Sequence, residues 1–242
     1  MSSQTKSSGP AVELRNLTKV FGSFAVLHNL TAAFARGRLY AIFGENGAGK
    51  STLLRLIAGL ARPTSGGIEI FGERDVRSVT ARLGYMAHAS MLYDELSALE
   101  NLRYFGALYG VNPSRCEKCV SDVGLDPALA RPIVEYSQGM RQRASLARAI
   151  LHDPELLLLD EPFSNVDAAS ARSIAELLGR MRAAGKTVLV VTHQAALLAE
   201  IADESLRLSA GRIAARAPGI AAADGTATPG SPAAVAVREA RA

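Results

Sequence analysis

The sequence predicts an α/β protein whose mostly parallel β-sheet is covered by helices on both faces. Short apolar runs at residues 39–43, 156–159 and 187–191 are typical of strands that are buried on both faces. Amphipathic stretches such as residues 51–60 and 168–183 alternate with these runs and are expected to be helices. With 242 residues and 48% hydrophobic content, the chain can bury one substantial core, or one core with a smaller lobe attached.

The first part of the chain is expected to be rich in β-structure. Apolar and polar residues alternate within residues 11–35, as they do in half-buried strands, and a Gly-rich turn at residues 65–67 precedes another apolar run. In chain order, the elements expected here are strands around 12–14 and 24–27, the buried strand at 39–43, the helix at 51–60 and a strand at 68–71.

The middle of the chain is expected to hold an inserted helical lobe, over about residues 88–137. Its helices are separated by the breaks Gly-Val-Asn-Pro and Gly-Leu-Asp-Pro at residues 110–113 and 124–127. The other elements expected in order are a strand at 81–85, a helix at 138–151, the strand at 156–159, the helix at 168–183, the strand at 187–191, a short helix at 195–201 and short strands around 205–208 and 213.

Composition sets the expected limits of the folded domain. Residues 1–10 are polar and Ser-rich, and residues 216–242 are rich in Ala, Pro, Gly and Thr with few large apolar side chains. Segments of this kind cannot bury enough apolar surface to fold, so we expect one domain at residues 11–215 with disordered ends. No apolar run approaches the length of roughly 18 residues that spans a bilayer, and the start lacks a signal-peptide core. We therefore expect a cytoplasmic protein unless a partner holds it at a membrane.

Charge and cysteine content narrow the classes of partner. The net charge of +4 and the pI of 9.3 arise without a dense Lys/Arg block, so no nucleic-acid partner is expected. Cys116 and Cys119 form a lone CxxC within a helix expected at residues 113–123. A structural zinc site needs four ligands and no second pair exists, which favours two helix-face thiols over a metal or redox role.

A Gly-rich loop follows the strand at residues 39–43 and opens the helix at 51–60. Glycines allow backbone conformations that a Cβ forbids, so successive N–H groups of the loop can point at an anion. The positive end of the helix dipole faces the same anion. Lys50 is expected to reach the β and γ phosphates of a nucleotide, and the Ser51 hydroxyl to ligate Mg²⁺. The expected phosphate-binding residues are Gly44, Glu45, Asn46, Gly47, Ala48, Gly49, Lys50, Ser51 and Thr52.

Two carboxylates follow the apolar run at residues 156–159, at the end of a strand where open α/β sheets bind ligands. We expect Asp160 to hold Mg²⁺ through its water shell, because Mg²⁺ takes one or two carboxylates and keeps several waters. Glu161 is then free to polarise the attacking water as a general base. The alternative is an acidic pair that merely ends a strand.

The segment Tyr136-Ser137-Gln138-Gly139-Met140 resembles the signature segment of ATP-binding-cassette ATPases, usually Leu-Ser-Gly-Gly-Gln, which opens a helix just before the acidic strand. Ser137 and Gly139 match, whereas Tyr136, Gln138 and Met140 depart from the commonest form. A small hydroxyl and an unhindered backbone at a helix N-terminus can receive a γ-phosphate. The resemblance implies that Ser137, Gln138 and Gly139 act in trans, on ATP bound to a second copy.

Three smaller matches extend this resemblance, which covers about residues 11–215. Phe21 occupies the place where the family stacks an aromatic ring on adenine. Asp167, in Ser-Asn-Val-Asp, aligns with the acid of the D-loop. His193 matches the switch histidine, which senses the γ-phosphate and orients the water. Taken alone, Phe21 would be a core or surface phenylalanine and His193 a structural histidine at a strand end, and Ser137 would be an ordinary helix cap.

One departure concerns His88, which stands where the family usually has Gln. Imidazole is a poor ligand for Mg²⁺, so we expect His88 to contribute to catalysis by a hydrogen bond to the metal's water or to phosphate. Residues 88–110 resemble the heme-exporter type of subunit used in cytochrome c maturation, in which His at this position is also familiar.

The family resemblance implies a P-loop NTPase fold with an N-terminal antiparallel β-subdomain and an inserted α-helical subdomain. It also implies an ATPase that uses ATP and Mg²⁺, pairs head-to-tail with a second, identical ATPase subunit, and drives export through separate membrane-spanning permease subunits. Such a subunit works at the cytoplasmic face of the cell membrane, with a groove beside His88 for the permease's cytoplasmic helices. The alternatives are a soluble family member acting on ribosomes or DNA, and a non-hydrolytic cassette; the presence of Glu161 and His193 counts against the latter.

Overall fold

The computed structural model describes residues 9–221, and the predictions for residues 1–8 and 222–242 lie outside the described part. Two sheets organise the fold. The central sheet has the order β5-β6-β7-β3-β8-β9, with every neighbouring pair parallel except β8 and β9. The smaller sheet, β2-β1-β4, is antiparallel throughout. The predicted α/β class, with a mostly parallel sheet and an N-terminal antiparallel subdomain, is confirmed.

The strands have the following bounds: β1 Val12–Phe21, β2 Phe24–Phe34, β3 Leu39–Gly44, β4 Ser65–Ile70, β5 Leu83–Met86, β6 Leu156–Asp160, β7 Thr187–Val191, β8 Glu204–Ser209 and β9 Arg212–Pro218. The α-helices are α1 Lys50–Ile57, α2 Ala98–Tyr109, α3 Pro113–Asp122, α4 Gln138–Ile150 and α5 Ala168–Ala183. Short 3₁₀ turns occupy Val76–Arg82, Ile133–Glu135 and Ala195–Leu198.

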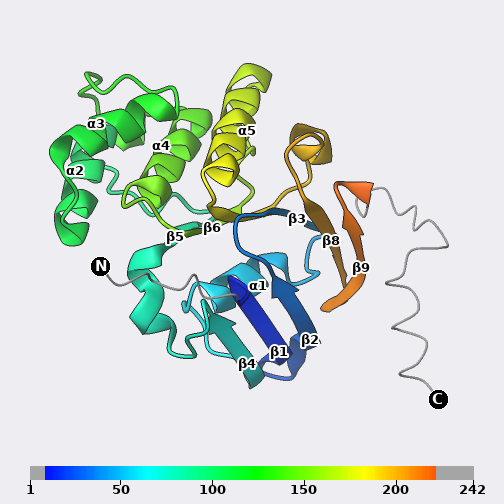
Figure 1. Cartoon of the computed structure of the whole chain (residues 1–242). Helices are drawn as coiled ribbons and strands as arrows, with labels where there is room; N and C mark the ends of the chain where they lie inside the picture. The colour runs from blue at the N-terminus through cyan, green and yellow to red at the C-terminus, as the bar shows by residue number, and fades with distance from the viewer. Residues whose placement is uncertain (1–8, 222–242) are drawn as a thin grey trace, which may run out of the picture.

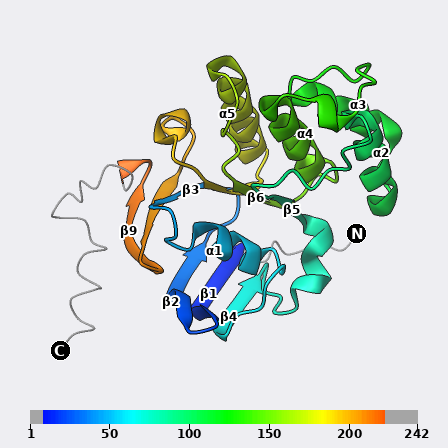
Figure 2. The ribbon, with the colours of Figure 1, turned by 180° about the vertical axis from the view of Figure 1, so that it is seen from behind.

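The central sheet separates two apolar cores. In Figure 1 the helices α2 to α5 lie above it, and α1 lies below, between the central and the antiparallel sheets; Figure 2 shows the same layers from behind. Along β3, Leu39, Ala41 and Phe43 face the upper core, whereas Tyr40 and Ile42 face the lower one. This two-sided burial explains why the central strands read as continuous apolar runs.

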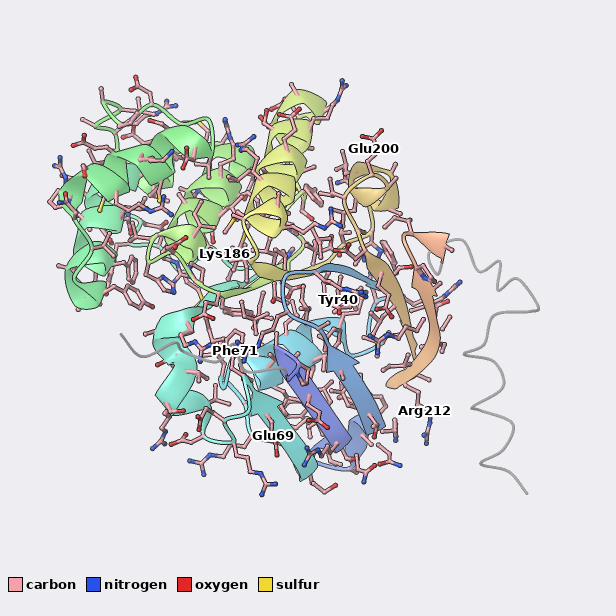
Figure 3. All side chains as sticks on the ribbon, viewed as in Figure 1. Tyr40, Glu69, Phe71, Lys186, Glu200 and Arg212 are labelled. Atoms are coloured by element: carbon pink, nitrogen blue, oxygen red, sulfur yellow. The ribbon has the colours of Figure 1, made fainter. Side chains whose placement is uncertain are left out.

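Tyr40 shows how the lower core accommodates a polar atom (Figure 3). Its ring meets Phe34 edge-on, with the ring centroids 5.0 Å apart. Its hydroxyl oxygen accepts a hydrogen bond from the backbone N–H of Ala35 at 2.7 Å. The packing joins the antiparallel sheet to β3, the strand that leads into the phosphate-binding loop.

Local signals set the ends of the helical lobe. Ser97 and Glu100 form a reciprocal capping box at the start of α2, and Gly110 ends this helix in a left-handed conformation.

Cys116 and Cys119 are both buried in α3. Burial raises the pKa of Cys119 to about 11, so its thiol stays protonated at neutral pH.

The C-terminal strand extends past the expected domain boundary at residue 215. β9 runs antiparallel to β8 as far as Pro218, within the segment that composition predicts to be disordered. Arg216 pairs with Glu204 across these strands and donates to the carbonyl oxygen of Ala33 at 2.8 Å. Pairing with β8 orders this segment, although its small side chains give no sequence signal for a strand.

The helix predicted at residues 195–201 is a 3₁₀ turn, Ala195–Leu198.

Candidate functional site: a phosphate-binding cavity at the end of the central sheet

The loop between β3 and α1 is shaped by two glycines that are packed against neighbouring strands. Gly44 has φ +146°, and a Cβ there would lie 2.2 Å from the carbonyl oxygen of Leu208. Gly49 has φ +98°, and a Cβ there would lie 2.9 Å from the carbonyl oxygen of Val26 in β2. No larger residue fits either place without moving a strand, so the sequence of the loop follows from its packing.

Lys50 is folded back over this loop. Its ammonium group donates to the carbonyl oxygens of Gly44 at 2.7 Å and Glu45 at 2.9 Å, and the residue is only 7% exposed. Burial lowers the pKa of Lys50, and the carboxylates of Glu161 and Asp160 oppose this shift. A largely desolvated cation fixed at the start of a helix is well placed to hold an anion.

A cavity of about 610 Å³ opens beside the loop and collects most of the predicted site residues. Its lining includes Asn46, Gly47, Gly49, Lys50, Ser51, Thr52, His88, Asp160, Glu161 and His193, together with Phe24, Val26, Ser164 and Val191. These residues come from β2, the loop, α1 and the ends of β5, β6 and β7. A larger hollow of about 1250 Å³, beside β1 and β4, contains none of them. We therefore assign the site to the smaller cavity, because the predicted functional residues line it and do not line the larger hollow.

The acidic end of β6 is held by backbone contacts. The N–H of Glu161 donates to Val191 at 2.9 Å, and the Nε2 of Gln142 donates to the carbonyl oxygen of Glu161 at 2.6 Å. These bonds hold the backbone of Glu161 at φ +54°, a conformation that residues other than glycine rarely adopt. Asp160 is buried at the same strand end. The carboxyl end of β6 thus carries a buried Asp160 and a partly buried Glu161.

Glu161 faces His193 across the cavity. The Oε1 of Glu161 lies 3.3 Å from the Nε2 of His193, and its Oε2 accepts the backbone N–H of His193 at 3.3 Å. Burial raises the pKa of Glu161, and the charge and backbone N–H of His193 partly lower it again. A buried carboxylate with a raised pKa is a stronger base than an exposed one, which suits the removal of a proton from water.

The signature residues lie apart from this cavity. Ser137 caps α4 by accepting the N–H of Met140 at 3.2 Å, and it does not line the cavity of its own chain. A Cβ on Gly139 would lie 2.9 Å from the carbonyl oxygen of Asn165, so this glycine allows α4 to pack on the loop before α5. Gln138 is exposed beside them.

Asp167 caps α5 within that neighbouring loop. Its carboxylate accepts the N–H groups of Ala169 and Ser170 at 3.1 and 2.9 Å, and the hydroxyl of Ser170 at 2.6 Å. The hydrogen bonds from Ser170 lower the pKa of Asp167. The acid therefore stabilises the start of α5 in the single chain.

Phe24 is the aromatic residue among those that line the cavity, and Phe21, which the resemblance predicts to stack on adenine, is not among them. Phe21 ends β1, is 54% exposed and has the ammonium of Lys19 at 4.7 Å from its ring centroid. Phe24 begins β2 and is 68% exposed. A large apolar side chain left in solvent at the mouth of the cavity offers a face for a flat ring. Only a weak signal, its place just after the Gly22 turn, marks Phe24 in the sequence.

Comparisons with known proteins agree with this geometry. A profile of the ABC transporter family matches residues 27–164. The chain belongs to the ABC transporter family. The lantibiotic transport ATP-binding protein SrtF of Streptococcus pyogenes is 31% identical over 79% of this chain and 84% of its own length. The bacitracin transport ATP-binding protein BcrA of Enterococcus faecalis is 33% identical over 79% of this chain and 64% of its own length.

Solved structures show the same fold. The dimeric structure of MJ0796, a bacterial ABC transporter cassette, has a TM-score of 0.80 and 26% identity, and the match covers 86% of this chain and 98% of that one. A post-hydrolysis state of MJ0796 bound to ADP and Pi has a TM-score of 0.78 and 27% identity over the same shares. The family member described here is therefore an ATPase whose cofactors are ATP and Mg²⁺, as the sequence predicts.

The residues present fit these cofactors. The cavity offers the hydroxyl of Ser51 and the carboxylate of Asp160, which are the oxygen donors that Mg²⁺ prefers. Within residues 9–221 no cluster of three or more His, Cys, Asp or Glu residues competes with this pair for a metal. Mg²⁺, when bound, neutralises charge on the phosphates during transfer.

Proposed function

We propose that this chain is the ATP-hydrolysing subunit of a membrane exporter and that it works as a head-to-tail pair of identical chains around two Mg-ATP. One observation carries the proposal: Lys50, Glu161 and His193 line one cavity, whereas Ser137 lies outside it. A second copy, turned by two-fold symmetry, can bring its own Ser137 to this cavity, and symmetry then creates two equivalent sites.

Each lining residue has a proposed task. Residues 44–52 bind the phosphates with backbone N–H groups, and Lys50 neutralises their charge. Glu161 accepts a proton from the attacking water, and His193, held by Glu161, orients that water beside the γ-phosphate. His88, which is exposed at the cavity wall, donates a hydrogen bond to phosphate or to water. Phe21 is proposed to stack on adenine, and Phe24, which lines the cavity, is a second candidate for this contact.

The signature segment and the D-loop complete the site from the partner. Ser137, Gln138 and Gly139 approach the γ-phosphate through the N-terminus of α4, whose dipole favours an anion. Gly139 packs on the backbone of Asn165, so the segment that ends at Asp167 moves with it. ATP thus joins the two copies, and loss of phosphate after hydrolysis weakens the contact.

The helical lobe carries the surface proposed to bind the membrane-spanning permease subunits. Several large apolar residues are exposed around α2: Met91, Tyr93, Tyr104, Leu108 and Tyr109. Contiguous exposed apolar groups of this kind mark binding surfaces. The chain is proposed to sit at the cytoplasmic face of the membrane, with cytoplasmic helices of the permease against this surface. No helix within the described residues has the length and apolar character needed to cross a bilayer.

Affinity purification from detergent-solubilised membranes tests the proposal. A tagged chain is expected to retain multi-span membrane proteins, and the double variant Leu108→Glu/Tyr104→Glu is expected to lose them while its ATPase activity in solution stays unchanged. The double variant Ser173→Glu/Ala183→Glu, at exposed positions of α5, is the control because it adds the same two negative charges. Recovery of the wild-type chain with ribosomes or DNA, and without membrane proteins, would favour the soluble alternative.

The cargo is a separate question. Residues 88–110 resemble heme exporters, whereas relatives compared with this chain have names that concern lantibiotics, bacitracin and Nod factors. Heme as cargo therefore stays a prediction from sequence. Deletion of the gene followed by heme staining of c-type cytochromes tests it: loss of staining supports heme export, and normal staining contradicts it.

A further inference from the structure

A small hollow lies between β5, α2 and the end of α4, at one edge of the exposed apolar surface. We name it the Arg148 socket and define it by Tyr85, Met91, Phe105, Tyr109, Arg148 and His152. Its volume is about 190 Å³, the scale of a single side chain, and its rim includes Leu60 and Met91, which are each about half exposed. Figures 1 and 2 both show β5, α2 and α4 side by side.

Arg148 is a largely buried cation without an anionic partner in the described structure. Its guanidinium donates to the carbonyl oxygen of Tyr85 at 3.2 Å and lies 5.3 Å from the ring centroid of Phe105. Its Nε is buried without a hydrogen-bond acceptor among the described residues. Burial lowers the pKa of Arg148, and the ionisable groups that oppose this shift are two tyrosines and no carboxylate. Buried arginines are almost always paired with an acid.

The other polar groups around the socket do not supply a negative charge. His152 stacks on Tyr109, with centroids 4.2 Å apart, and its Nε2 donates to the carbonyl oxygen of Leu83 at 2.9 Å. Asp153, the next residue, is engaged by the ammonium of Lys186 at 2.9 Å. The socket is therefore an apolar hollow with one positive charge at its wall.

We infer that the Arg148 socket receives a single acidic side chain from a cytoplasmic helix of the membrane partner. The carboxylate pairs with the Arg148 guanidinium, and apolar residues one turn away on the same helix pack on Leu60, Met91 and Tyr109. The identity of the partner rests on the proposed function, whereas the demand for a carboxylate rests on Arg148 alone. A neutral polar side chain of the same shape leaves the buried charge uncompensated and binds more weakly.

Two small probes of matched shape test this inference on the full chain. 3-Phenylpropionate carries a carboxylate on an apolar body, and 3-phenylpropionamide is its neutral counterpart. Each is titrated while the ¹³C-methyl signal of Met91, assigned with Met91→Leu, is followed by NMR. We expect saturable shifts at Met91 and a carboxylate preference of about tenfold or more, the size typical of a charge-assisted hydrogen bond. Equal binding of the two probes, or no shift at Met91, would overturn the inference.

Variants of Arg148 separate charge from packing. Arg148→Met keeps most of the apolar contact and is expected to abolish the carboxylate preference, whereas Arg148→Lys is expected to retain part of it. Arg103→Met, on the solvent-exposed side of α2, is the matched control and should bind both probes as the wild type does. If Arg148→Met fails to fold, as judged by thermal unfolding, Arg148→Lys decides: a preference as strong as that of the wild type would contradict the paired guanidinium.

Purification from membranes distinguishes the two proposals. If the wild-type chain retains membrane subunits but shows no carboxylate preference, the socket inference fails and the proposed function stands. If the preference is found but no membrane subunit is retained, the proposed function fails, and the acidic partner must be sought elsewhere. If both hold, Arg148→Met is expected to retain about tenfold less membrane subunit than Arg103→Met, whereas equal retention would contradict the docking role of the socket.

Discussion

Replacing Glu161 by Gln tests the chemistry of the cavity most sharply, because the amide keeps the shape of the side chain and removes its charge. The Oε2 of Glu161 accepts the N–H of His193 at 3.3 Å, and an amide oxygen can accept the same bond. The side chain is 15% exposed, so the substitution removes a charge whose burial is unfavourable. We therefore expect a folded protein that is at least as stable as the wild type.

The expected loss lies in turnover alone. A general base accelerates a reaction by about 10² to 10⁴, which corresponds to about 2.7 to 5.5 kcal/mol of the activation barrier. Lys50 and residues 44–49 do not depend on the Glu161 charge for their hydrogen bonds, so ATP is still expected to bind. Because ATP then persists at the contact between two copies, the paired form should accumulate.

Steady-state phosphate release and size-exclusion chromatography with Mg-ATP measure the two effects. Glu155→Gln is the matched control: it removes the same charge from an exposed pair with Arg82 and should change neither turnover nor pairing. If Glu161→Gln hydrolyses ATP within about threefold of the wild-type rate, far above the range expected for a lost base, the base lies elsewhere.

Four further outcomes are expected. Lys50→Ala should bring ATP binding, measured by calorimetry, below detection, and unchanged affinity would contradict the loop assignment. Because Glu161 must be ionised to act and burial raises its pKa above 4.5, kcat should fall as pH drops through that raised value. His193 lowers this pKa, so the acid limb of His193→Ala should move to higher pH; a limb that stays in place would contradict the pairing. Gly49→Ala should lower the free energy of unfolding by about 1 to 3 kcal/mol, more than Gly47→Ala, which has space for a Cβ.

Those parts of the fold that depend on local chemistry could be predicted from the sequence. The α5 helix and the β7 strand lie at the predicted residues, because Asp167 caps the helix from the adjacent position and the β7 run is apolar on both faces. The phosphate-binding loop is equally local. Its glycines, Lys50 and Ser51 are contiguous, and the cavity gathers most of them.

Features that depend on distant pairing could not be predicted as well. β2 runs to Phe34, well past its predicted core, because it pairs along β1 through several register shifts. β9 exists because Arg216 and its neighbours pair with β8. Phe24 reaches the cavity only through the placement of the antiparallel sheet beside the loop. A single sequence contains at most a weak local signal for such contacts.

The mixing of two inactive variants tests the central claim, that each ATP site combines two copies of the chain. Lys50→Ala disables the loop, and Ser137→Asn removes the signature hydroxyl while retaining a good helix cap. In a mixed pair, one site combines both defects and the other combines neither. We expect an equimolar mixture to recover about a quarter of wild-type activity, because half of the random pairs are mixed and each has one intact site. A mixture no more active than its two components would contradict the shared site.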